Sequence, residues 1–333
     1  MENNKFNKLL NDKYYLMQEI AKKYNYSEEL LDMITCTYVS FYMDLGKSVD
    51  LPLYDLFDKV KIIYEPGNVG EIALRNGFDE IPGDSAAITF FIPNLKVFQN
   101  PDLKQNPQII LLGTHVQDYL ATPALKLEMI IHEIRHALMG YYNTNILLDD
   151  KTYYMRSGLQ ETFYTRNDNS KKGFDSKRIA RTLDEILNTY ISEILLNRVK
   201  SFSKYDIENK NIHRYVQSIK TVHEDNIYRA IGYHEDVKLF FPMLKSQMFI
   251  DLVNQHQFDG EIETIKSFME SLTDKMDYLS FVNLLDKINV NNPQYPKAAA
   301  EGNMDFVMEH ANDIHNAKEV ILDMQKNLKK AGE

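Results

Sequence analysis

The chain has 333 residues, of which 44% are hydrophobic and 26% are charged, so it holds enough apolar material for a sizeable core. Its 48 acidic and 38 basic residues give a net charge of −10, and no Lys/Arg-rich tract interrupts that balance. This composition argues against a nucleic-acid partner, whose phosphates require a basic surface. The single cysteine, Cys36, excludes an internal disulfide and a multi-cysteine zinc site.

The N-terminal residues lack the basic start and the apolar stretch of a signal peptide. No run approaches the roughly 18 consecutive apolar residues of a transmembrane helix. The sequence therefore predicts a cytoplasmic protein without a membrane span. A protein exported without a signal peptide would have the same features.

The first 50 residues predict two helices. Apolar residues recur near the helical spacing within residues 6–24. Ser27, which two glutamates follow, has the form of an N-cap for a second helix that continues towards Gly46. We expect residues 1–50 to form an N-terminal helical segment.

Three runs rich in β-branched and aromatic residues predict strands after Pro52. These runs cover residues 60–65, 86–92 and 108–112, and turn-like Pro-Gly pairs separate the first two. We expect them to form a small, mostly antiparallel sheet.

Two helices follow the predicted strands. Thr122 and Pro123 have the form of an N-cap and a first helical residue, so we expect a helix over residues 123–140. Residues 143–175 are largely polar and predict a loop. Ser176 is positioned to cap the next helix, over residues 177–200.

The remaining chain predicts helices nearly throughout residues 205–333. We expect breaks at Gly232, Pro242, Gly260 and the Asn-Asn-Pro sequence at 291–293. Because strands and helices are segregated along the chain, the predicted class is α+β. The predicted domains are the segment 1–50, a core over residues 51–200 and a C-terminal helical subdomain over residues 201–333.

The predicted helix over residues 123–140 contains the sequence His132-Glu133-Ile134-Arg135-His136. Random placement of residues would give about 0.02 such H-E-x-x-H motifs in a chain of this composition. Residues four apart on a helix lie about 40° apart, so both imidazoles can reach one zinc ion at about 2.0–2.1 Å. Glu133 lies beside this position, which suits a residue that accepts a proton from water. Arg135 must face solvent or pair with a carboxylate.

A catalytic zinc ion needs a third protein ligand. A third histidine close to the motif is excluded, because Met139 and Tyr142 occupy the glycine and histidine positions of the longer HExxHxxGxxH pattern. A downstream carboxylate remains. Glu185 adjoins an apolar helical stripe and is the preferred ligand, and Asp184 and Glu193 are the alternatives.

The motif and the sequence LDEILNTY at residues 183–190 together resemble the gluzincin metallopeptidases, the thermolysin-like group. The resemblance covers residues 85–200 and implies a zincin-like core. One Zn²⁺ per chain would be held by His132, His136 and Glu185. One position departs from the family, because Thr189 stands where gluzincins often place an aspartate that orients a metal-bound histidine.

The resemblance implies hydrolysis of peptide bonds in a peptide or protein substrate, with Glu133 as general base. The substrate would lie along an edge strand, for which residues 86–92 and 108–112 are the candidates. The stabilising donor for the developing oxyanion stays open, and Tyr190 and His234 are the residues we predict. The other candidates are Tyr153, Tyr154 and Arg156.

A second interpretation stays open, in which the chain is a helical binding protein whose zinc site is structural or has lost its chemistry. The intact Glu133 favours the enzyme, because a structural site has no need of a base.

Overall fold

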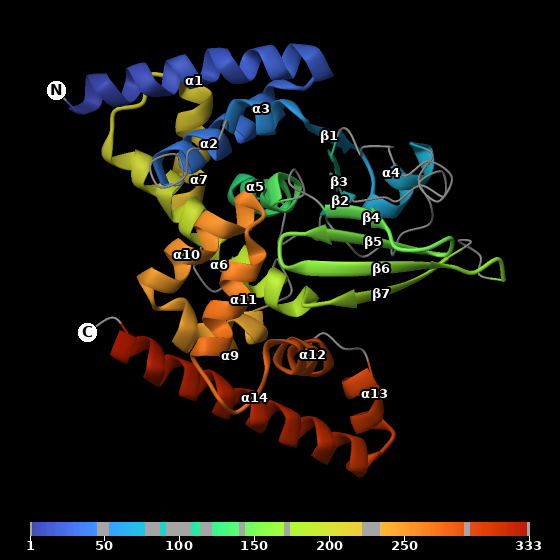
Figure 1. Cartoon of the computed structure of the whole chain (residues 1–333). Helices are drawn as coiled ribbons and strands as arrows, with labels where there is room; N and C mark the ends of the chain where they lie inside the picture. Colours follow the sequence, from blue (N-terminus) through green and yellow to red (C-terminus); the bar gives the residue numbers. More distant parts are fainter. Residues whose placement is uncertain are drawn as a thin grey trace. The chain divides into compact units, whose positions relative to one another are not determined.

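The computed structural model describes residues 2–44, 53–76, 87–90, 108–113, 122–139, 144–169, 174–221, 234–289 and 294–331. Helices dominate these residues, and two small sheets accompany them (Figure 1). This arrangement confirms the α+β class. No helix among the described residues is both long enough and apolar enough to cross a membrane.

Contacts divide the chain into two compact units that alternate along the sequence. Unit 1 comprises Met1–Ile92, Gln105–Tyr141 and Ile191–Ile231, and unit 2 comprises Pro93–Lys104, Tyr142–Tyr190 and Gly232–Glu333. This division differs from the three consecutive segments predicted from the sequence. One helix, α6 (Arg181–Ser201), contributes residues to both units.

Unit 1 contains a three-stranded sheet and most of the N-terminal helices. Its elements besides the second half of α6 are α1 (Glu2–Tyr24), α2 (Glu28–Asp44), α3 (Leu53–Asp58), β1 (Val60–Glu65), α4 (Val69–Arg75), β2 (Ala87–Phe90), β3 (Gln108–Gly113), α5 (Pro123–Met139), the 3₁₀ turn η4 (Phe202–Lys204) and α7 (Lys210–Thr221). The predicted helices and strands of residues 6–140 are thus confirmed to within a few residues at each end.

The sheet of unit 1 has the strand order β1-β3-β2. Strand β1 pairs parallel with β3, with Val60 opposite Gln108, and β2 pairs antiparallel with β3, with Ala87 opposite Leu112. The sheet is therefore mixed. Helix α5 packs against all three strands and α4 packs against β3. Because β3 is covered by helices, Leu111 at its centre is fully buried.

Unit 2 contains a four-stranded antiparallel sheet in the order β4-β5-β6-β7. The strands are β4 (Thr144–Leu147), β5 (Thr152–Ser157), β6 (Gln160–Arg166) and β7 (Phe174–Ile179). The prediction of a polar loop over residues 143–175 is therefore wrong. The helix predicted from residue 177 begins only at Arg181. The preceding residue, Ala180, has a left-handed backbone conformation (φ 61), which is incompatible with a right-handed helix.

The physical reason for this error lies in the turns and in the alternating burial of the side chains along β5. Tyr153, Met155 and Ser157 are buried while their neighbours are only partly buried, as in a strand with one covered face. The Asp149 carboxylate accepts two backbone N–H groups in the β4–β5 turn. Gly158, with φ 60, allows the tight β5–β6 turn.

The helices of unit 2 confirm the predicted helical character of the C-terminal part. Besides the first half of α6, they are α9 (His234–Leu244), α10 (Gln247–Asp259), α11 (Ile262–Ser271), α12 (Tyr278–Ile288), α13 (Gln294–Ala300) and α14 (Met304–Ala331). The predicted break at Pro242 is wrong, because this residue lies inside α9. The break at Gly260 is confirmed, since this residue ends α10 with φ 81. The breaks at Gly232 and at 291–293 lie outside the described residues.

Candidate metal centre

The histidine motif lies in the middle of α5, a helix that is buried along most of its length. Thr122 begins the helix, because its Oγ1 accepts the N–H of Leu125 (3.4 Å). His132 is 6% exposed and Glu133 is 9% exposed, whereas His136 is half-buried. Arg135 is fully buried, which excludes the first of its two expected surroundings, solvent, and leaves a carboxylate partner as the prediction.

The two imidazoles are placed as the ligands of one metal ion would be. The Nε2 atoms of His132 and His136 lie 3.1 Å apart, and the ring planes meet at 83°. Two nitrogens bound to a tetrahedral zinc ion lie about 3.3 Å apart, given zinc–nitrogen distances of about 2.0–2.1 Å. The pair of histidines therefore fits two ligands of a zinc site.

Glu185 completes a group of three possible ligands. One ligand atom from each of His132, His136 and Glu185 lies within 4.8 Å of the other two. No other group of three or more His, Cys, Asp and Glu side chains within the described ranges is placed to hold a metal ion. Two nitrogens and one carboxylate oxygen form a donor set typical of catalytic zinc.

The two alternative carboxylates of α6 have other surroundings. Asp184 is 3% exposed, and its Oδ1 accepts the backbone N–H of Leu159 (2.8 Å) and the amide of Gln257 (3.2 Å). Glu193 lies two helical turns beyond Glu185 and interacts electrostatically with Glu128. Asp184 thus joins the β5–β6 turn and α10 to α6, a structural role that the sequence analysis missed.

Glu133 has a hydrogen-bond partner that the sequence did not indicate. The hydroxyl of Thr89 on β2 donates to Oε2 of Glu133 (2.6 Å), and the same Oγ1 lies 3.0 Å from the Glu133 carbonyl oxygen. This contact connects the strand next to α5 with the predicted general base. Thr89 is the one polar residue of an otherwise apolar strand. This is the feature of the sequence that could have indicated a contact with the helix.

A second buried carboxyl group lies one turn before His132. Glu128 is 1% exposed, and its Oε2 has no hydrogen-bond partner in the part of the chain that the structure describes. Burial, together with the negative charge of Glu193, raises the pKa of Glu128 well above its usual range. Helix α5 therefore contains a buried carboxyl group whose charged form is less stable than that of an exposed glutamate.

Thr189 takes the position at which an orienting aspartate was expected. It is 1% exposed, and its Oγ1 has no hydrogen-bond partner among the described residues. A threonine hydroxyl carries no charge, so it cannot orient an imidazole as strongly as an aspartate does. The residue that orients each histidine stays unassigned.

The residues predicted as oxyanion donors differ in their surroundings. The half-buried Tyr190 packs edge-on against Phe241, with ring centroids 6.4 Å apart. His234 is the first residue of α9, and its side chain lies outside the description. Tyr153 is almost fully buried, and Arg156 donates to the Gly260 carbonyl (2.9 Å). The roles of Tyr190 and His234 stay predictions.

Of the two strands considered for substrate, only β2 lies at a sheet edge. Strand β3 is central, between β1 and β2, so its backbone groups are paired on both sides. The alternative of residues 108–112 as the substrate strand is therefore wrong. Strand β2 pairs on one side only within the described part of the sheet, and it carries Thr89.

No family model, curated protein or solved structure matches the chain.

Proposed function

We propose that the protein is a zinc-dependent metallopeptidase of gluzincin type. The observation that carries the proposal is the grouping of His132, His136 and Glu185 within 4.8 Å of one another. Glu133 follows the first histidine and is held by a hydroxyl from a neighbouring strand. A structural site would need the three ligands but not the base, so the combination favours an enzyme.

His132, His136 and Glu185 would hold the zinc ion, which would act as a Lewis acid and lower the pKa of a bound water towards neutral pH. Glu133 accepts one proton as the water oxygen attacks the peptide carbonyl carbon. When the carbon–nitrogen bond breaks, Glu133 delivers that proton to the leaving nitrogen. Thr89 holds the Glu133 carboxylate in one orientation during both transfers.

The proposed substrate is a peptide or a flexible segment of a protein. Strand β2 has backbone N–H and C=O groups on the side that no described strand occupies, and an extended peptide can pair with such groups. The strand also positions Glu133 through Thr89, so the proposed substrate strand and the proposed base belong to one arrangement.

The metal content of purified protein tests the ligand set. We expect about one zinc per chain by elemental analysis, loss of zinc in His132→Ala and reduced zinc in Glu185→Ala. His213→Ala is the matched control, because this histidine is exposed on α7, and it should keep its zinc. A wild-type protein that binds no zinc in a chelator-free preparation would overturn the proposal.

Cleavage of a peptide library tests the chemistry separately. Glu133→Gln should keep its zinc but cleave at least about a hundredfold more slowly, because the amide cannot accept the proton. Glu19→Gln, an exposed change on α1, should cleave at the wild-type rate. Zinc-loaded wild type that cleaves no peptide would favour the second interpretation, a binding protein with a structural metal.

A further inference from the structure

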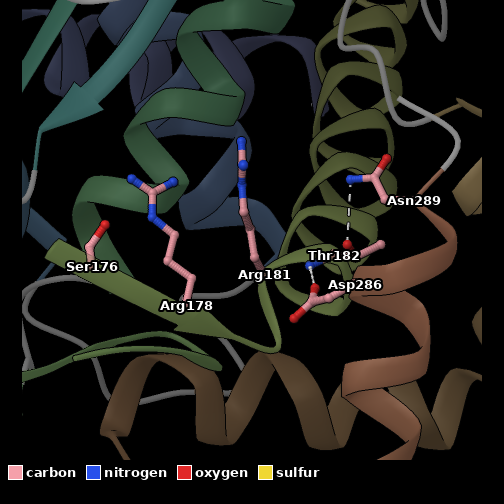
Figure 2. A pocket seen from close by; sticks show the side chains of 6 residues that line it. All are labelled: Ser176, Arg178, Arg181, Thr182, Asp286 and Asn289. Carbon is pink, nitrogen blue, oxygen red and sulfur yellow. Dashed lines mark hydrogen bonds between the residues drawn. The ribbon is translucent and has the colours of Figure 1, made fainter. Parts of the chain in front are cut away.

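Unit 2 contains a cleft of about 330 Å³ that the proposed peptidase chemistry does not use. Its walls come from the end of β7, the start of α6 and the end of α12 (Figure 2). The residues that line it are Ser176, Arg178, Arg181, Thr182, Asp286 and Asn289. Five of the six can donate hydrogen bonds from a side chain, and two of these five carry a positive charge.

The two arginines of the cleft form no ion pair with any carboxylate of the described residues, although the protein carries a net charge of −10. Arg75, Arg166 and Arg198 each have such a partner. Both cleft arginines are exposed, and Figure 2 shows Arg178 and Arg181 extended towards the same side. Two neighbouring guanidinium groups that no described carboxylate neutralises give the cleft a capacity to bind an anion.

The one carboxylate of the cleft is already engaged. Oδ1 of Asp286 accepts the backbone N–H of Thr182 (2.7 Å), so it caps the start of α6. Oδ2 of Asp286 is buried and has no hydrogen-bond partner among the described residues, so this carboxylate is one negative charge against the two arginines. The amide of Asn289 lies 3.5 Å from the Thr182 hydroxyl. The charge that the lining presents to a ligand is therefore positive.

We infer that this cleft binds an oxyanion, namely a phosphate or carboxylate group of a small ligand. Guanidinium groups are planar and match two oxygens of such a group at once. Ser176 is on the same face of β7 as Arg178, because it is two residues away, and its hydroxyl adds a donor. The cleft is larger than one phosphate ion, so the anionic group would belong to a larger molecule.

Titration calorimetry with inorganic phosphate and with succinate, at constant ionic strength, tests the inference. We expect wild type to bind at least one of the two with a Kd on the order of 1 mM. Arg178→Gln and Arg181→Gln should each weaken that binding at least about fivefold, and the double variant should abolish it. Phosphate alone would indicate a phosphorylated ligand, and succinate alone would indicate a carboxylate ligand.

Lys177→Gln is the matched control. It removes the same charge from β7, but its side chain lies on the opposite face of the strand and does not line the cleft. It should bind within about twofold of wild type. Equal losses in Lys177→Gln and Arg178→Gln, or no binding by folded wild type at about 10 mM ligand, would overturn the inference.

The inference is independent of the proposed metal. His132→Ala should lose zinc yet bind the anion as wild type does, because no residue of the cleft belongs to the ligand group. Anion binding that disappears in His132→Ala would place the anion on the metal and would overturn the assignment to the cleft. If a variant lost only its peptidase activity, its binding of the anion would be unchanged.

Discussion

At the scale of single residues, the contact between Thr89 and Glu133 matters most for the proposed chemistry. A carboxylate on a helix can rotate about its side-chain bonds, and each lost orientation has an entropic cost. The hydrogen bond of 2.6 Å removes part of that freedom before substrate binds. In the proposed mechanism, the Thr89 hydroxyl is therefore a positioning group and not a catalytic residue.

Replacement of Thr89 tests this role. Thr89→Val keeps the shape and the β-branch but removes the donor, so we expect kcat to fall about tenfold with KM and zinc content nearly unchanged. Thr89→Ser keeps the donor and should restore most of the rate. Peptide cleavage kinetics on each zinc-loaded variant give the measurement. Equal rates for the valine variant and wild type would contradict a positioning role.

At the scale of elements, Asp184 determines how α6 is held within unit 2. The buried N–H of Leu159 in the β5–β6 turn and the buried amide of Gln257 on α10 both donate to this one carboxylate. A buried donor without its acceptor carries a desolvation cost of about 1–3 kcal/mol. The adjacent residues of α6 therefore have different tasks, since Asp184 joins elements and Glu185 faces the two histidines.

A pair of alanine substitutions separates these tasks. Asp184→Ala should lower the free energy of unfolding by about 2–4 kcal/mol and leave about one zinc per chain. Glu185→Ala should lose zinc affinity with a much smaller effect on the zinc-free protein. Urea unfolding of chelator-treated protein and elemental analysis measure the two effects. If Asp184→Ala lost zinc and Glu185→Ala kept it, Asp184 would be the ligand.

At the scale of the whole molecule, a buried carboxyl group makes the stability of the fold depend on pH. Asp32 on α2 is 5% exposed. Burial, with the nearby charges of Glu28 and Glu29, raises its pKa to about 6, although Arg214 on α7 opposes this shift. A carboxyl group with a raised pKa in the folded state favours folding while it is protonated. The contribution of Asp32 to the free energy of unfolding is complete below pH 3.8, the pKa of the carboxyl group in the unfolded chain. It is lost as pH rises through about 6.

Asp32→Asn should therefore gain stability relative to wild type as pH rises. We expect the difference in free energy of unfolding to grow between pH 4 and about 6 and to level off above that, at about 2–3 kcal/mol. Urea unfolding of both proteins across this range gives the measurement. Glu19→Gln, whose carboxylate is exposed, should show a flat difference. A pH-independent difference for Asp32→Asn would contradict the assigned pKa.

Local patterns in the sequence predicted α1, α2, α5 and β1 to β3 to within a few residues, but they did not indicate the short helices α3 and α4. The spacing of His132 and His136 depends only on helical geometry, so it was predictable, and the position of Glu185 followed from a local string on the next helix. The sheet of residues 144–179 was not predictable in the same way. Its strands are no shorter than β1 to β3, but they carry more polar residues, and pairing between neighbouring strands defines them more than their own composition does.

The sequence by itself determined the class of the fold, the pair of histidines and the glutamate between them, because each depends on residues a few positions apart. Only the tertiary structure decided that Thr89 holds Glu133, that Asp184 joins three elements, and that Arg178 and Arg181 share a cleft with Asp286. These contacts join residues from 25 to more than 100 positions apart. No local periodicity encodes them, because they arise when separately formed helices and strands pack together.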